Sequence, residues 1–240
     1  MGNRVLVLSG GLDSTILAYK IHSELKEGEK LFAITYNYGQ RHSIEIDKAK
    51  MTCQKLGIDH RIIDISFIGD IIAPVSALSN KKEVAMPTIK DTVGHPQPVS
   101  YVPFRNLLLT SMAMTFAESN GADEVYLGLQ SIDSYAYWDT SPEFVESFNN
   151  VSALNRLKSI SLKAPFISMT KKDEILLGLT LNVPFEDTWT CYSGEEGHGA
   201  CGTCPSCSER IMNFAKAGLK DPCRYAKEID WDKLIEKVKE

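Results

Sequence analysis

Residues 9–14 read Ser-Gly-Gly-Leu-Asp-Ser and directly follow the apolar run Val5–Leu8. Two glycines let the backbone approach an anion without a Cβ in the way, so several amide N–H groups point at one spot. A helix N-terminus after them adds a positive dipole end and unpaired donors. Ser9, Ser14 and Thr15 offer hydroxyl donors. The segment therefore predicts a phosphate site, and because no Gly-Lys-Ser/Thr follows, it is not a Walker A loop.

Four cysteines near the C-terminus have the spacing C-x9-C-x2-C-x2-C: Cys191, Cys201, Cys204 and Cys207. Four thiolates satisfy tetrahedral Zn²⁺ and leave no open position, which predicts a structural zinc site. An iron–sulfur cluster, which also takes four cysteines, and reactive or merely buried thiols are the alternatives. We expect residues 188–210 to form a zinc-binding loop that is clamped against the rest of the domain.

Composition narrows the class of protein. A chain of 240 residues that is 43% hydrophobic can form a full core, so we expect residues 1–240 to be a single domain, which the phosphate site makes a nucleotide-binding one. No apolar run approaches the roughly 20 residues that span a bilayer, and residues 1–20 lack a secretory signal. The cysteine clustering favours a metal site in a reducing cytoplasm. With a net charge of −5, the protein as a whole does not attract nucleic acid electrostatically. Any anion-binding site must therefore depend on local groups.

Strand-like and helix-like segments alternate along the chain. We expect strands at residues 4–8, 31–36, 61–65 and 124–129, and helices at 14–25, 44–56, 107–118, 206–217 and 230–240. This alternation predicts an α/β fold with a doubly wound parallel sheet, whose ligands bind beyond the carboxyl ends of the strands. Residues 66–103 contain five prolines and no clear period. A segment of that length predicts a lid or substrate loop.

The segment Ser9–Ser14 resembles the PP-loop of the ATP pyrophosphatase superfamily, whose members cleave ATP between the α- and β-phosphates. The resemblance implies an adenine nucleotide α-hydrolase-like fold. It also implies that ATP contacts Leu8, Ser9, Gly10, Gly11, Leu12, Asp13, Ser14 and Thr15. A substrate oxygen then attacks the α-phosphate while the loop stabilises the departing pyrophosphate. Because Asp13 repels phosphate, its expected role is to hold the loop or to bind Mg²⁺.

Further motifs resemble the QueC family of 7-cyano-7-deazaguanine synthases. In the family's order, the chain has Tyr38-Gly39-Gln40-Arg41-His42 with Glu45, Val102-Pro103-x-Arg105-Asn106, then Asp133, Tyr137 and Asp139, and the four-cysteine loop with Gly202 and Arg210. The match covers nearly the whole chain. It implies ATP-dependent conversion of 7-carboxy-7-deazaguanine and ammonia to the nitrile, through an adenylate, for queuosine in tRNA or for deazaguanine-modified DNA. It also implies a homodimer that contacts no nucleic acid directly.

The resemblance assigns catalytic roles to basic residues as well as to Asp13. Arg41 and Arg105 are expected to bind phosphate or carboxylate, since a guanidinium binds either in bidentate fashion. Lys171, at the start of a helix, is expected to neutralise the leaving pyrophosphate. His42 has either an acid–base or a structural role. The simpler alternative for each basic residue is an ordinary surface charge.

The expected substrate contacts follow from the shape of a guanine-like ring. Asp133 or Asp139 is expected to accept from its N–H edge, with Asn106 in the same binding set. Tyr137 or Trp138 is expected to stack on its face. The alternative for these aromatic residues is ordinary core packing.

The chain departs from the family where the deazaguanine pocket is expected. The family usually reads V-P-G-R-N, whereas Phe104 stands in the glycine position. In the family's S-G-Y-P-D-C-R segment, Trp138 replaces the proline and Ser141 the arginine. The product therefore stays open between the nitrile, the intermediate 7-amido-7-deazaguanine and a conjugate of another amine.

Three other functions remain as alternatives. A PP-loop sulfurtransferase that adenylates a tRNA base needs a basic surface, which the acidic composition does not favour. An ammonia ligase of the GMP- or NAD-synthetase type would share the PP-loop, but that function does not account for the four-cysteine loop. A non-catalytic, zinc-clamped ATP sensor would bind nucleotide without turnover.

Overall fold

One parallel sheet of five strands organises the protein in the computed structural model, which describes residues 2–39, 44–78, 84–85, 101–130, 137–193 and 197–238. The strands are β1 Asn3–Val7, β2 Leu31–Asn37, β3 Asp59–Asp64, β4 Ala122–Tyr126 and β5 Ser161–Lys163. Their order is β3-β2-β1-β4-β5, and every pairing is parallel. The chain builds outward from β1 in one direction and then in the other. The strand order therefore reverses at β1, where such sheets bind ligands.

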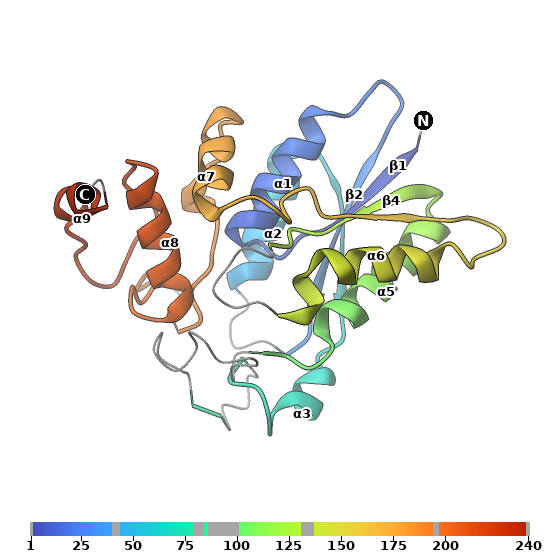
Figure 1. The fold of residues 1–240 in the computed structure, drawn as a ribbon, viewed down its shortest axis with the longest axis horizontal. Helices are drawn as coiled ribbons and strands as arrows, with labels where there is room; N and C mark the ends of the chain where they lie inside the picture. The colour runs from blue at the N-terminus through green and yellow to red at the C-terminus, as the bar shows by residue number, and fades with distance from the viewer. Residues whose placement is uncertain are drawn as a thin grey trace.

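The helices cover both faces of the sheet (Figure 1). They are α1 Leu12–Ser23, α2 Ile44–Leu56, α3 Ile68–Ile72, α5 Arg105–Ser119, α6 Pro142–Ser152, α7 Lys171–Thr180, α8 Pro205–Lys216 and α9 Trp231–Lys237. Two 3-10 turns lie at Trp138–Thr140 and Phe185–Asp187. Among the described residues, no helix has the length and apolar character that crossing a bilayer requires.

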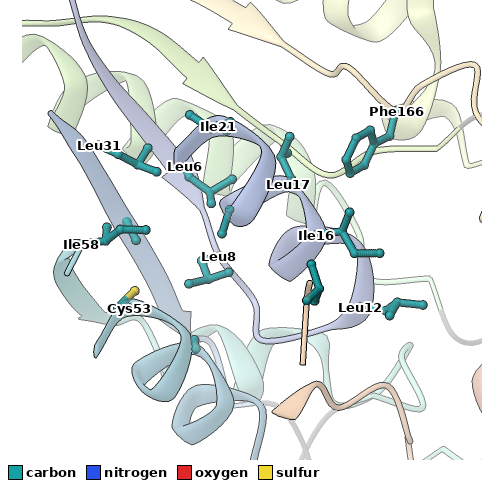
Figure 2. Packing of buried hydrophobic residues seen from close by; sticks show 14 of the residues in the cluster. Leu6, Leu8, Leu12, Ile16, Leu17, Ile21, Leu31, Cys53, Ile58 and Phe166 are labelled. Atoms are coloured by element: carbon teal, nitrogen blue, oxygen red, sulfur yellow. The ribbon is translucent and has the colours of Figure 1, made fainter. Parts of the chain in front are cut away.

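Alternation along β1 divides the core into two layers. Leu6 and Leu8 point into the cluster under α1, α2 and α7, which Figure 2 shows from close by, whereas Val5 joins the cluster under α5 and α6. Beyond α7, the chain adds α8 and then α9 as successive neighbours (Figure 1). The α/β fold with a parallel sheet is thus confirmed.

Several boundaries differ from the expected ones. Helix α1 begins two residues before Ser14, because Gly11 occupies the N-cap position. The expected segments omit β5 and α6, although Ser141 caps α6 by accepting a hydrogen bond from the Phe144 N–H at 3.1 Å. Of the expected lid at residues 66–103, the described part contains α3, and residues 79–83 and 86–100 lie outside the described residues.

Candidate functional site

The turn from β1 into α1 is held by hydrogen bonds between its own serines. Ser14 Oγ accepts from the Ser9 N–H at 3.1 Å and lies 2.9 Å from Ser9 Oγ, which accepts from the Gly11 N–H at 3.2 Å. Gly11 is the N-cap of α1 and supplies no side-chain cap. The first N–H groups of α1 therefore lack a capping side chain at the end of the helix where an anion binds best.

Close packing around the loop explains its first glycine. Gly10 has a φ of +82°, and a Cβ there would lie 2.0 Å from the carbonyl oxygen of Glu45, in the first turn of α2. On the other side, the Gly10 carbonyl accepts from the Trp189 N–H at 3.0 Å. The loop is therefore wedged between the start of α2 and the segment that leads into the four-cysteine region.

Asp13 forms an ion pair with Lys171 beside this loop. Lys171 Nζ lies 2.7 Å from Asp13 Oδ1, and the lysine side chain is only 10% exposed. Lys171 stands at the first position of α7, which Thr170 and Asp173 start with reciprocal capping hydrogen bonds. The pair supports the expected role of Asp13 in holding the loop.

A cavity of about 370 Å³ opens at the carboxyl ends of β1 and β4. Its lining includes six residues expected in the site: Ser9, Asp13, Ser14, Arg105, Asn106 and Lys171. Tyr137 also borders it, as do Leu8 and Leu12, whose side chains belong to the core under α1. Thr15 does not line the cavity, and its Oγ1 is buried without a hydrogen-bond partner among the described residues. The expected hydroxyl contact from Thr15 to phosphate therefore has no support from its position.

Polar side chains around Arg105 line the same cavity. The Arg105 guanidinium carbon lies 6.0 Å from the centroid of the Tyr38 ring. Burial raises the pKa of Glu45 to about 7, while the positive charge of Arg105 opposes the shift. Tyr38 and Glu45 both line the cavity. The motif that contains Tyr38 and Glu45 does not by itself give either residue a role, because their position beside Arg105 is a tertiary property.

Two expected substrate contacts, Asp139 and Trp138, do not line the cavity. The Asp139 carboxylate accepts from the Asn106 N–H at 3.3 Å, and Asn106 Nδ2 donates to the Asp139 carbonyl at 3.1 Å. Asp139 is buried and does not line the cavity, so it stabilises the start of α5. Trp138 is also outside the lining and donates from Nε1 to the Tyr101 hydroxyl at 2.8 Å. Neither position favours direct contact with a substrate ring.

Phe104 adopts the backbone conformation that glycine prefers. It has a φ of +53° immediately before α5, and its ring packs edge-on against Trp138 at 5.4 Å. A bulky residue in the left-handed region costs on the order of 1–3 kcal/mol. The Tyr101 hydroxyl accepts from the Phe104 N–H at 3.0 Å and so helps to hold this conformation. Two of the departures from the family pattern, Phe104 and Trp138, are thus packed against each other.

Three expected site residues lie outside the described part of the chain: Arg41, His42 and Asp133. Their roles remain predictions.

The four cysteine sulfurs converge on one point. All four lie within 4.8 Å of one another, and Cys201 Sγ is 3.9 Å from Cys207 Sγ. Ligands at about 2.3 Å from a tetrahedral metal ion are separated by about 3.8 Å, so this arrangement fits one ion. Backbone N–H groups of Ser193 and Cys201 point at Cys191 Sγ from 3.3 and 3.2 Å, as suits a thiolate. The cluster is therefore a metal site by its donors and by its geometry.

A buried ion pair joins the segments around this cluster. Arg210 on α8 contacts both carboxylate oxygens of Asp221, at 2.6 and 2.9 Å. It also donates to Thr188 Oγ1 at 2.7 Å and to the Phe185 carbonyl at 3.0 Å. The Tyr225 hydroxyl donates to the same carboxylate at 2.6 Å. Arg210 thus connects three stretches of chain, and its hydrogen-bond partners among the described residues have structural roles, although Arg210 also borders the cavity.

Asp221→Ala is expected to lower the free energy of unfolding by about 3–5 kcal/mol, because it leaves the buried Arg210 guanidinium without its counterion. Chemical denaturation measures the loss. Asp232→Ala is the matched control, since Asp232 pairs with Lys220 while 84% exposed. Its expected effect is below about 1 kcal/mol. Equal losses in the two variants would contradict the assigned importance of the buried pair.

Comparisons with known proteins identify the family of the chain. Residues 3–218 match the family described as "Queuosine biosynthesis protein QueC". A protein named 7-cyano-7-deazaguanine synthase from Caldicellulosiruptor bescii is 41% identical over 232 residues, which cover 95% of this chain and 99% of the relative. Proteins of the same name from Caldicellulosiruptor saccharolyticus and Psychromonas ingrahamii are 40% and 39% identical, over 95% and 92% of this chain and 97% and 96% of their own lengths.

Proposed function

The chain belongs to the QueC family of queuosine biosynthesis proteins, and on that premise we propose that it converts 7-carboxy-7-deazaguanine and ammonia to 7-cyano-7-deazaguanine at the expense of ATP. One observation carries the proposal. The uncapped start of α1, the Asp13–Lys171 pair and the Arg105 guanidinium all border a single cavity. A triphosphate and a carboxylate substrate can therefore meet there.

The proposed reaction begins with the activation of a poor acylating agent. A carboxylate oxygen of the substrate attacks the α-phosphorus of ATP, the bond to the bridging oxygen breaks, and pyrophosphate leaves with the electron pair. Ammonia then adds to the acyl carbon, loses a proton and expels AMP to form the amide. A second ATP activates the amide oxygen in the same way. Loss of AMP and of the N–H protons gives the nitrile.

Different residues of the cavity bind the different negatively charged groups of the reaction. The amide N–H groups of the loop, with Ser9 and Ser14, bind the pyrophosphate end of ATP. Lys171 follows the negative charge that develops on the leaving group, and Asp13 holds it there beforehand. Arg105 binds the substrate carboxylate or the α-phosphate. We also assign Arg41 to this group on its motif position alone.

The domain organisation, metal content, oligomeric state and cellular location of the protein are also part of the proposal. We propose that residues 1–240 form one domain and that the four cysteines hold a structural Zn²⁺ within the loop 188–210, with an iron–sulfur cluster as the alternative that metal analysis decides. When bound, Zn²⁺ would stabilise the conformation of that loop. Mg²⁺ would bind together with ATP, coordinated by its phosphates. We further propose a cytoplasmic homodimer that binds small molecules rather than nucleic acid.

Mass spectrometry of the products tests the function directly. The purified protein is incubated with 7-carboxy-7-deazaguanine, ATP, Mg²⁺ and ammonium, and the same mixture without ATP is the control. We expect the mass of the nitrile together with AMP and pyrophosphate. Accumulated amide, or a conjugate, would replace the nitrile as the product. Absence of any ATP-dependent product would overturn the proposed function.

A further inference from the structure

A buried acid stands directly behind the Asp13–Lys171 pair. Glu174 follows Lys171 by one helical turn on α7 and is 0% exposed. Gln130, just after β4, donates from Nε2 to Glu174 Oε1. The other oxygen, Oε2, is buried and has no regular hydrogen bond within the described part of the chain. Asp13 on α1 and Lys171 on α7 are the charged groups that act on this carboxyl.

Charge counting around Glu174 favours its neutral form. With Asp13 ionised, an ionised Glu174 would add a second, fully buried negative charge beside the single positive charge of Lys171. A buried carboxylate without its own counterion takes up a proton instead. In agreement, burial raises the pKa of Glu174 to about 10, the charge of Asp13 adds to the shift, and Lys171 opposes it.

The contact from Gln130 also decides which oxygen carries the hydrogen. A side-chain amide N–H donates to an acceptor, so Glu174 Oε1 must present a lone pair. The proton then belongs to Oε2, the oxygen without another partner. An O–H at that atom can donate to the Asp13 carboxylate, with which Glu174 interacts.

We propose that Glu174 is a positioning residue, whose neutral carboxyl donates a hydrogen bond to Asp13 and keeps that carboxylate in place when Lys171 turns toward the phosphates. The inference rests on the proposed function, because it assumes that Lys171 exchanges Asp13 for the leaving pyrophosphate. At that moment Asp13 loses its counterion. A neutral donor behind it preserves one contact without adding negative charge next to the triphosphate.

Protonation of Glu174 is tested without any substrate, through the pH dependence of unfolding. The folded protein would keep a proton that the unfolded chain releases above its ordinary pKa, so stability falls as pH rises toward the folded value. Relative to Glu174→Gln, the unfolding equilibrium constant of the native chain is expected to increase by up to about tenfold per pH unit between about pH 5 and 9. Parallel pH dependence in the two proteins would overturn the proposal.

The positioning role is tested by kinetics of AMP formation in two variants. Glu174→Gln keeps a donor toward Asp13 and an acceptor toward Gln130, so kcat and the KM for ATP are expected to stay within about threefold. Glu174→Met has similar length but no donor, and kcat is expected to fall about tenfold to a hundredfold, the cost of one unsatisfied buried group. Glu146→Met on the exposed side of α6 is the matched control and should match the native chain.

Equal impairment of the Gln and Met variants would overturn the positioning role. If Glu174→Met does not fold, the comparison of Glu174→Gln with the native chain decides alone, and a Gln variant with less than a tenth of native kcat would contradict the proposal. Failure of the proposed function shows itself separately, as absence of product from the native chain.

Discussion

Asp13→Ala is expected to reduce ATP-dependent AMP formation by about a hundredfold to a thousandfold, the loss typical of removing one group that organises transition-state charge. The carboxylate lies 2.7 Å from Lys171 Nζ and is the partner that holds the lysine beside the loop. Without it, Lys171 loses the ion pair that holds its ammonium beside the loop, where it meets the leaving pyrophosphate. The variant also leaves the Glu174 carboxyl facing an apolar methyl group.

Two measurements separate this effect from unfolding. Circular dichroism and thermal denaturation should show a folded protein, because Asp13 is at the cavity edge and its side chain is 30% exposed. Asp47→Ala removes an acid that is 61% exposed on α2, and it should leave turnover unchanged. A folded Asp13→Ala protein with native turnover would refute the role given to the loop.

Cys207→Ser is expected to abolish stoichiometric metal binding and to destabilise the protein by about 4 kcal/mol or more, as loss of a structural metal does. Cys207 is 1% exposed at the start of α8, and its sulfur is one of the four that converge. Because Trp189 in the preceding segment donates to the Gly10 carbonyl, loosening this region also loosens the loop. Turnover should therefore fall as well.

Plasma mass spectrometry gives the metal content of this variant, and chemical denaturation gives its stability. Cys223→Ser is the matched control, since Cys223 is a free cysteine outside the converging group and should leave the metal in place. A Cys207→Ser protein that is metal-replete and as stable as the native chain would contradict the structural role of the cluster.

Local sequence signals were sufficient for the parts of the fold with strong patterns. An apolar run indicates the strand at Asn3–Val7, and two glycines indicate the turn after it. The start of α7 at Lys171 was also expected. The four cysteines were predicted to converge because their spacing allows it, and they do. Weak signals were missed: β5 Ser161–Lys163 has only three residues, too few for a period to appear.

The sequence could not predict which side chains of the site are buried and which ones face the cavity. Asp139 and Trp138 have the right chemistry for a guanine-like ring, yet Asp139 is buried against the start of α5, Trp138 contacts Tyr101, and neither lines the cavity. Glu174 appears in the sequence as one of several charged residues that begin a helix. Only the packing of α7 against α1 shows that it is the fully buried acid beside Asp13 and Lys171.

The central claim is that the loop holds ATP so that a substrate carboxylate attacks its α-phosphorus. Transfer of an isotopic label tests this most directly, with 7-carboxy-7-deazaguanine that carries a heavy oxygen isotope in both positions of its carboxylate. We predict that each AMP released contains one heavy oxygen atom, because the attacked phosphorus keeps the oxygen of the substrate when ammonia expels the nucleotide. Unlabelled AMP, or ADP in place of AMP, would contradict the account.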